Sequence, residues 1–252
     1  MHAIHYVVDS NGIATLTVDR PAVKNALDWA AMRAFAHTVQ RAALSPNLRA
    51  LIITGAGDTF IAGGDMKDLA NFPNRADGVR LSTIMGKALE RLRALPCPTI
   101  AAINGPALGG GAEVAVACDI RVMARSATIG FVQARLGMVT GWGGARRLLP
   151  LVGYPMALQL LATARVLDAN EAKEIGLIDH LVAPGQALQT AQKLAEQMAE
   201  NPMEAVRAAK KLLRVAVTNP EVAKQAERRL FAKLWASDFR RQAVARFFNR
   251  TK

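Results

Sequence analysis

The sequence is poor in aromatic residues. Only 5% of its 252 residues are Phe, Trp or Tyr, and no segment alternates aromatic with basic residues as RNA-binding motifs do. Nucleic acid is therefore not the expected partner, although Lys and Arg outnumber Asp and Glu by 32 to 20. The formal net charge of +12 can equally serve a phosphorylated small ligand or solubility. The basic residues form only modest clusters, at Arg146-Arg147, Lys210-Lys211 and Arg240-Arg241.

Cysteine is also scarce. Cys97 and Cys118 form no Cys-x-x-Cys pair and have no histidine at zinc-binding spacing, so we expect no metal site. Both lie in apolar stretches, which predicts buried free thiols. The first residues lack the pattern of a signal peptide, and a reducing, cytoplasmic location is expected. The longest apolar region, residues 99–118, is interrupted by glycines, Pro106 and Glu113 and is not a membrane span.

Two common nucleotide-binding motifs are absent. No Gly-x-Gly-x-x-Gly is followed by a ribose-binding carboxylate, and no Gly-Lys-Ser/Thr of the Walker type occurs. The sequence therefore predicts neither a dinucleotide cofactor nor a P-loop.

The hydrophobic pattern alternates between strands and helices through the first 150 residues. A hairpin is expected at Ile4–Val8 and Ile13–Val18, with Asn11-Gly12 in the turn. Helical spacing predicts helices over 28–44, 78–95 and about 110–117, and β-rich runs predict strands at 50–54, 99–103, 120–123 and 128–130. This order is typical of an α/β fold with a mostly parallel sheet.

The pattern after about residue 153 is entirely helical. Asp168 is expected to cap a helix that runs to Ile175 and ends at Gly176. Asn201-Pro202 is expected to start a helix with Pro at its first position. A single long basic helix is expected from Pro220 to Phe248.

Three glycine-rich segments carry the candidate chemistry. Gly63-Gly64 follows an expected strand, Gly109-Gly110-Gly111 precedes a helix, and Gly137 to Gly144 forms a glycine-rich turn. Singly, each is a weak signal: a Gly pair is usually a turn, and a Gly triplet before a helix also suits a phosphate nest. Together, the free N–H groups of the first two segments favour a developing negative charge. The third segment is expected to bring backbone close to a substrate.

The three segments, in this order, resemble the crotonase, or enoyl-CoA hydratase/isomerase, superfamily. The resemblance runs from about Ile4 to the C-terminus, and its most specific pieces are residues 61–65, 101–113 and 118–120. It implies an α/β fold with a repeated ββα spiral core over residues 1–195. It also implies a helical C-terminal region, residues 196–252, that drives trimerisation, often as a dimer of trimers.

The resemblance further implies an acyl thioester of coenzyme A as substrate, with no separate cofactor because the CoA belongs to the substrate. The N–H groups of Gly64 and Gly110 would form an oxyanion hole for a thioester enolate. A surface-charge role is the competing interpretation for Lys24, Lys67 and Arg250. The residues expected along the CoA are Lys24, Ala26, Ala62, Asp65, Met66 and Lys67 and, from a neighbouring subunit, Phe247 and Arg250.

One position departs from the pattern of the family's hydratases, which use two glutamates. The first maps to Glu113, but the second maps to Gln133. Hydration needs a base for the water and an acid for the α-carbon, and an amide cannot exchange a proton at neutral pH. A carboxylate at position 113 also complements a helix dipole, yet the motif match favours a catalytic role for Glu113.

The segment from Ile129 to Gly144 is similar to the ethylmalonyl-CoA and methylmalonyl-CoA decarboxylase branch. Decarboxylation needs no base, because breaking the C–C bond yields the enolate directly. Gln133 or Arg135 would orient the departing carboxylate, and Glu113 would protonate the α-carbon. The expected function is thus an acyl-CoA lyase of the hydratase/isomerase family with Glu113 as acid/base. The alternatives are a malonyl-type CoA decarboxylase and a non-catalytic CoA- or RNA-binding relative.

Overall fold

The computed structural model describes residues 3–249 and has the alternating strand and helix order expected for the first 150 residues. The strands are β1 (Ile4–Val8), β2 (Ile13–Val18), β3 (Ala50–Gly55), β4 (Thr99–Ile103), β5 (Ala107–Leu108), β6 (Ile120–Ala124), β7 (Thr128–Gly130), β8 (Val166–Asp168) and β9 (His180–Val182). The α-helices are α1 (Trp29–Ala43), α2 (Met66–Leu69), α3 (Arg75–Ala94), α4 (Gly110–Ala115), α5 (Gly144–Thr163), α6 (Ala169–Glu174), α7 (Ala187–Ala199), α8 (Met203–Thr218), α9 (Pro220–Trp235) and α10 (Asp238–Asn249). Two 3-10 turns, η1 (Pro21–Val23) and η2 (Val132–Leu136), complete the order.

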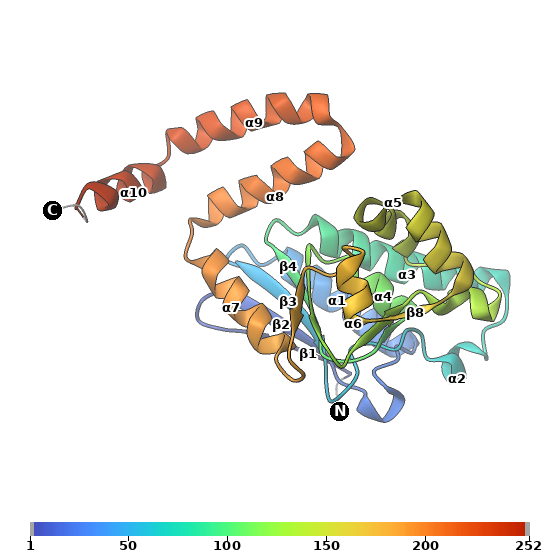
Figure 1. Cartoon of the computed structure of the whole chain (residues 1–252). Coiled ribbons are helices and arrows are strands. Elements are labelled where there is room, and N and C mark those ends of the chain that lie inside the picture. Colours follow the sequence, from blue (N-terminus) through green and yellow to red (C-terminus); the bar gives the residue numbers. More distant parts are fainter. Residues whose placement is uncertain (1–2, 250–252) are drawn as a thin grey trace.

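The main sheet has the strand order β1-β2-β3-β4-β6-β9. β1 and β2 form the predicted antiparallel hairpin, and every later neighbour in this sheet is parallel. Parallel strands need both faces covered. The helix α7 packs across β2, β3, β4 and β6, while α1 packs against α3 and β1 (Figure 1). The expected α/β architecture with a mostly parallel sheet is confirmed.

The helix α1 shows how sequence pattern becomes packing. Asp28 caps its start by accepting a hydrogen bond from the Ala31 N–H at 2.7 Å. The apolar residues at helical spacing, Ala31, Phe35 and Val39, are fully buried in the core. The prediction of a helix over 28–44 is therefore confirmed.

A second, smaller sheet joins β5, β7 and β8 beside the main one. β5 is parallel to β7, and β8 is antiparallel to β7. The Gly109 N–H, between β5 and α4, donates to the carbonyl oxygen of Gly130 at the end of β7 at 2.8 Å. This sheet thus holds the glycine triplet at the edge of the core.

The prediction of an entirely helical region after residue 153 is wrong. β8 pairs with β7, and β9 extends the main sheet beside β6. Each strand has only three residues, too short for an alternating pattern to be read from sequence. Between them, Asp168 caps α6 as expected and Gly176 follows its end with a φ of 76°.

The C-terminal helices correct two further predictions. Pro202 is the N-cap of α8 and not its first residue. Pro220 does begin a helix, but this helix ends at Trp235, and a separate helix starts at Asp238. Ser237 makes the break because its hydroxyl accepts the Arg240 N–H at 3.2 Å, which is the contact of an N-cap.

The helices α8, α9 and α10 extend from the body of the molecule as an arm (Figure 1). α8 packs against α9, and its contact with the body includes one buried cation. Lys210 Nζ donates to the Cys97 carbonyl at 2.7 Å and lies 2.6 Å from Asp119 Oδ2. The middle of α8 is therefore held against the body by polar contacts with the segment before β4 and the loop before β6.

The prediction of two buried free thiols is confirmed. Burial raises the pKa of Cys97 to about 11 and that of Cys118 to about 12. Neither group is therefore a thiolate at neutral pH. Within residues 3–249, no helix combines the length and the apolar character that crossing a lipid bilayer requires.

Candidate active site

Backbone hydrogen bonds bring the first two glycine segments together. The Leu108 N–H donates to the Ile61 carbonyl at 3.1 Å, which places residues 61–64 beside β5. On the other side, the Leu27 N–H donates to the Gly63 carbonyl and the Asp65 N–H donates to the Leu27 carbonyl, each at 2.8 Å. Residues 61–65 therefore lie between the loop before α1 and the strand that leads into α4.

The two segments that carry the predicted oxyanion-hole residues are neighbours in space. A Cβ added at Gly63, where φ is +102°, would lie only 3.2 Å from the Gly110 nitrogen. Within the described part of the chain, neither the Gly64 N–H nor the Gly110 N–H donates a hydrogen bond. Such N–H groups call for an acceptor. Two free N–H donors therefore lie on neighbouring segments.

Trp142 covers Gly110. A Cβ at Gly110 would lie 2.2 Å from a Trp142 ring atom, so the indole occupies the space that any side chain at position 110 would need. Trp142 is itself buried, with 4% exposure. This close approach requires glycine at position 110.

Glu113 lies one turn along α4 from Gly110 and is 2% exposed. Its Oε1 accepts two backbone N–H groups, from Trp142 and Gly144, both at 2.8 Å. Its Oε2 accepts the Gln133 amide Nε2 at 2.9 Å. All three donors are neutral groups, so the carboxylate has no direct cationic partner.

Burial raises the pKa of Glu113 above its ordinary value. The hydrogen bonds from Gly144, Trp142 and Gln133 oppose this rise, as does the positive charge of Arg147. Because burial is the larger effect, the proton of Glu113 is held more tightly than that of an exposed glutamate. A carboxyl group of this kind suits proton transfer near neutral pH.

Gln133 lies next to Glu113, as the motif comparison predicts. It belongs to η2, directly after β7, and its side chain is partly buried. The Nε2 contact with Glu113 leaves the buried Oε1 without a partner in the described chain. The structure therefore pairs one carboxylate with one amide at this site.

The six predicted CoA-contacting residues in the N-terminal half fall on two adjoining segments, residues 24–26 and 62–67. The Ala62 N–H donates to the Lys24 carbonyl at 3.1 Å, which joins the segments. The side chains of Lys24, Met66 and Lys67 are exposed, so an extended ligand can reach them. Binding of CoA there stays a prediction.

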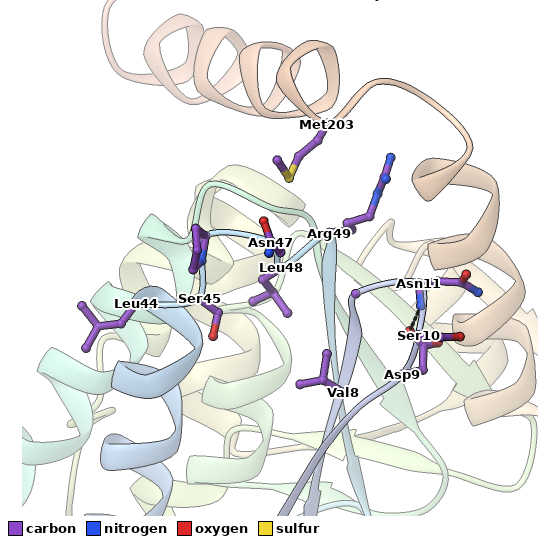
Figure 2. Close-up of a pocket in the computed structure, with 12 residues that line it drawn as sticks. Val8, Asp9, Ser10, Asn11, Leu44, Ser45, Asn47, Leu48, Arg49 and Met203 are labelled. Carbon is purple, nitrogen blue, oxygen red and sulfur yellow. Dashed lines mark hydrogen bonds between the residues drawn. The ribbon is translucent and has the colours of Figure 1, made fainter.

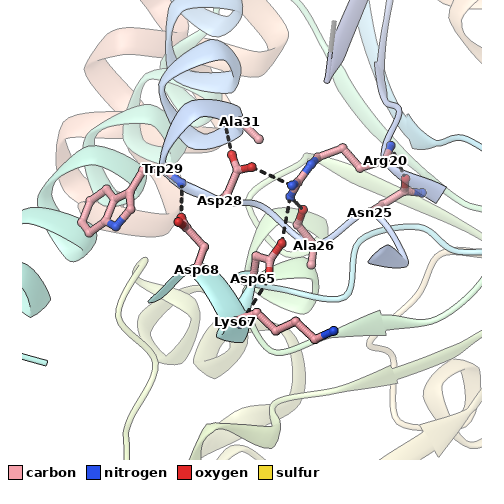
Figure 3. A network of polar contacts seen from close by, with 9 residues as sticks. All are labelled: Arg20, Asn25, Ala26, Asp28, Trp29, Ala31, Asp65, Lys67 and Asp68. Atoms are coloured by element: carbon pink, nitrogen blue, oxygen red, sulfur yellow. Dashed lines mark hydrogen bonds and ion pairs between the residues drawn. The ribbon is translucent and has the colours of Figure 1, made fainter. Parts of the chain in front are cut away.

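Asp65 is occupied by contacts within the chain. Its Oδ1 accepts the Lys67 N–H at 3.2 Å as the cap of α2, and its Oδ2 lies 3.3 Å from Arg20 Nη1. Arg20 also contacts Asp28 at 2.6 Å and donates to the Ala26 carbonyl (Figure 3). The Asp65 carboxylate therefore holds the two segments together.

The remaining predicted residues lie in the arm or beyond it. Phe247 belongs to α10, which lies far from α2 in Figure 1. Arg250 lies outside the described residues. A contact of either residue with CoA bound to a neighbouring subunit stays a prediction.

The glycine-rich turn 137–144 has a use that sequence reasoning missed. Its N–H groups at Trp142 and Gly144 bind the Glu113 carboxylate. Sequence reasoning instead expected this turn to bring backbone close to a substrate. The only hint in the sequence is the pair Gly143-Gly144 before a helix, because a backbone N–H donor does not depend on the type of residue that carries it.

A surface cleft of about 650 Å³ lies elsewhere. It is bordered by the turn after β1, the loop before β3 and Met203 at the start of α8 (Figure 2). None of the predicted site residues that the structure describes lines this cleft. The cleft marks the junction of arm and body, separate from Glu113.

The chain is similar in sequence to a known protein family and to several of its members. A family model described as enoyl-CoA hydratase/isomerase matches residues 9–252. A short-chain-enoyl-CoA hydratase of Clostridium acetobutylicum is 36% identical over 208 residues, which cover 82% of this chain and 79% of that protein. An ethylmalonyl-CoA decarboxylase of Rattus norvegicus is 35% identical over 246 residues, which cover 96% of this chain and 82% of that protein.

Comparison with solved structures gives the same result for the fold. A crystal structure of an enoyl-CoA hydratase from Bacillus anthracis superposes with a TM-score of 0.94 at 31% identity, covering 98% of this chain and 96% of that one. A structure described as a putative enoyl-CoA hydratase/isomerase from Mycobacterium abscessus gives a TM-score of 0.93 at 29% identity, with coverage of 98% and 97%. The fold expected from the motif resemblance is therefore confirmed.

Proposed function

The chain belongs to the enoyl-CoA hydratase/isomerase family, and on this premise we propose that it is an acyl-CoA lyase with Glu113 as its acid/base. The observation that carries the proposal is the Glu113 carboxyl group, which is buried among neutral donors one turn of α4 after the free N–H of Gly110. A buried carboxyl with a raised pKa beside two free N–H groups suits proton transfer to and from a carbon next to a thioester.

The Gly64 and Gly110 N–H groups bind the thioester oxygen in this proposal. As the reaction proceeds, negative charge develops on that oxygen and an enolate forms. Donors fixed by the backbone stabilise this charge without having to reorganise, and losing one such donor typically costs about 10²–10³-fold in rate. The support from the structure is that both N–H groups are unused and lie on neighbouring segments.

Glu113 transfers the proton through Oε2. Its Oε1 is already occupied by two N–H groups, whereas Oε2 has only the Gln133 amide. In isomerisation, Oε2 takes a proton from one carbon and returns it to another. In hydration, the same oxygen must take the proton of water and deliver it to the α-carbon, because Gln133 can orient water but cannot exchange a proton.

The second candidate is decarboxylation of a malonyl-type CoA ester, which Gln133 favours specifically. The bond between the α-carbon and the carboxylate breaks, its electron pair forms the enolate, and carbon dioxide leaves. Glu113 then donates its proton to the α-carbon and takes another from solvent. This reaction needs one acid and no second carboxylate, which matches the Glu113–Gln133 pair.

The decisive experiment is a panel of acyl-CoA thioesters analysed by mass spectrometry. Crotonyl-CoA gaining one water supports hydration, a shifted double bond at unchanged mass supports isomerisation, and ethylmalonyl-CoA or methylmalonyl-CoA losing carbon dioxide supports the second candidate. Tight CoA binding without any conversion would instead favour a non-catalytic relative. No conversion and no CoA binding would overturn the proposal.

We propose in addition that the chain self-associates through its arm, as a trimer or hexamer. Exposed apolar patches mark protein interfaces, and α8 and α9 expose Leu213, Val217, Phe231 and Trp235. Sedimentation that gives a single chain at micromolar concentration would contradict this. A reducing, cytoplasmic location also stays a prediction, supported by the two free thiols.

A further inference from the structure

A buried arginine lies directly behind the Glu113 site. Arg147, in the first turn of α5, is 3% exposed. Its Nη1 donates to the Trp142 carbonyl at 2.7 Å, and its Nη2 pairs with Glu90 Oε1 of α3 at 2.8 Å. A buried guanidinium is costly unless it is paired and hydrogen-bonded, so these two contacts hold it at a defined place.

The carbonyl that Arg147 holds is part of the Glu113 binding loop. It belongs to the peptide unit between Trp142 and Gly143, and the units on either side carry the two N–H groups that bind Glu113 Oε1. Gly143 has a φ of +91°, and a Cβ there would lie 2.7 Å from Arg147 Nη1. The loop therefore fits closely around the guanidinium.

Trp142 connects the same loop to the other half of the site. Its backbone N–H binds Glu113, while its ring fills the space beside Gly110. A shift of the Trp142 peptide would therefore move both a donor to Glu113 and the ring that packs against Gly110.

We propose that Arg147 is a positioning residue for this site: by fixing the Trp142 carbonyl, it aligns the two N–H groups that hold Glu113 Oε1 and leaves Oε2 for proton transfer. The inference rests on the proposed function, since it concerns the geometry of the acid/base assigned there. Arg147 touches no reacting atom and acts through the backbone of Trp142.

We call the path from Arg147 through the Trp142 carbonyl to Glu113 the relay; among the described residues, few charged groups surround it. Arg147 is the cation whose charge lowers the pKa of Glu113, against the larger effect of burial. Arg147 is in turn surrounded by Glu90 and Arg93 of α3 and by its neighbour Arg146. The groups that face Glu113 from η2 and from the loop before α5 are the neutral Gln133 amide and backbone N–H groups.

Arg146 provides a matched control, because it pairs with the same Glu90 carboxylate but is 63% exposed in its side chain. We expect Arg147→Met to lower kcat by about 10–100-fold with little change in KM, since small misplacements of a catalytic group can cost about 10²-fold. The Glu113 limb of the pH profile should also move to higher pH, because a nearby positive charge is lost. Arg146→Met should change neither.

Two milder variants test the same relay if Arg147→Met does not fold. Arg147→Lys keeps the charge but cannot make both contacts; it should lower kcat and leave the pH profile near that of the wild type. Glu90→Gln removes the anchor of Arg147 from a half-exposed position and should lower kcat more than Arg146→Met does. If all folded variants match Arg146→Met in kcat and pH profile, the inference is overturned.

Titration of the Glu113 carboxyl by carbon-13 NMR separates this inference from the proposed function, since it needs no substrate. The signal is assigned by its loss in Glu113→Gln. A titration at higher pH in Arg147→Met, but not in Arg146→Met, supports the relay even if no acyl-CoA is converted. Identical titrations in both variants would overturn it even if the wild type is an active lyase.

Discussion

Glu113 and Asp65 are carboxylates on neighbouring segments, and different donors hold them. Asp65 lies beside the Arg20 guanidinium, which also contacts Asp28 at 2.6 Å (Figure 3). Within the described residues, Glu113 accepts from two backbone N–H groups and the Gln133 amide, and Arg147 contacts the Trp142 carbonyl rather than the carboxylate. The Asp65 carboxylate is used in contacts that join segments of the chain, whereas burial among neutral donors raises the pKa of Glu113. The difference separates a carboxylate that fixes the fold from one suited to proton transfer.

The largest test of this distinction is Glu113→Gln. Removing a general acid or base typically costs about 10²–10⁴-fold in rate, and we expect a loss of this size in kcat for whichever acyl-CoA is converted. Glu174→Gln, at an exposed position of α6, serves as the control. Steady-state kinetics make the comparison, and equal rates in the two variants would remove Glu113 from the mechanism.

Gly110→Ala tests the donor side of the site. The added methyl group would meet the Trp142 ring at 2.2 Å, so the ring or α4 must move and the Gly110 N–H is misplaced. We expect kcat to fall by about 10²–10³-fold, the usual cost of losing an oxyanion donor. Gly86→Ala in α3 is the control, since nothing lies within 4 Å of its added Cβ. It should keep full activity and gain roughly 0.5–1 kcal/mol in unfolding free energy.

Gln133→Glu sharpens the comparison by adding a second carboxylate 2.9 Å from the first. Two carboxylates this close cannot both ionise, so one pKa rises strongly. We expect crotonyl-CoA hydration to increase by about 10²-fold, the lower range for a gained acid/base, and malonyl-type CoA binding to weaken. Gln133→Met, which adds no charge, should increase neither. Unchanged hydration in Gln133→Glu would contradict the role given to this position.

The smallest expected effect is a pH-dependent change in the free energy of unfolding. Burial raises the folded-state pKa of Glu113 above its unfolded value, so protonation of Glu113 stabilises the folded chain. This stabilisation is complete at pH values below the unfolded pKa. That stability is lost as pH rises through the folded pKa, and each tenfold difference in proton affinity between the folded and unfolded chain corresponds to about 1.4 kcal/mol. Urea unfolding across this window should show the step in the wild type but not in Glu113→Gln. Parallel curves for the two proteins would contradict a raised pKa.

The dependence of activity on pH, which follows the titration of Glu113, distinguishes the two candidate reactions. A decarboxylase uses protonated Glu113, so its rate should fall as pH rises through the folded pKa. An isomerase or hydratase begins with ionised Glu113, so its rate should fall as pH decreases through that value. The direction in which the rate falls with pH thus complements the products identified by mass spectrometry.

Sequence reasoning was most successful where side-chain pattern and motif agree. The hairpin and β4 follow from β-rich runs and α1 from helical spacing, and Gln133, the position indicated by the motif comparison, lies beside Glu113. It failed for β8 and β9, where three residues carry too little pattern, and at Ser237, where a capping hydroxyl interrupts otherwise continuous helical spacing.

The support around the site could not be predicted for a different reason. Trp142 and Gly144 hold Glu113 through backbone N–H groups, which every residue except proline possesses. Arg147 looked like part of a modest basic cluster with Arg146, yet one side chain is buried and the other exposed. Only the three-dimensional path of α5 past Glu90 separates the two arginines.

Because Oε1 of Gln133 has no hydrogen-bond partner in the described chain, the Gln133 amide can form a hydrogen bond with either protonation state of Glu113. With Glu113 ionised, the amide faces it with Nε2, the donor seen in the structure. A half-turn of the same amide would present Oε1, which accepts a hydrogen bond from a protonated Glu113 Oε2. An amide at this position can therefore accompany its neighbour through a complete proton cycle without changing its own charge, whereas a glutamate there would have to gain or lose a proton at each step.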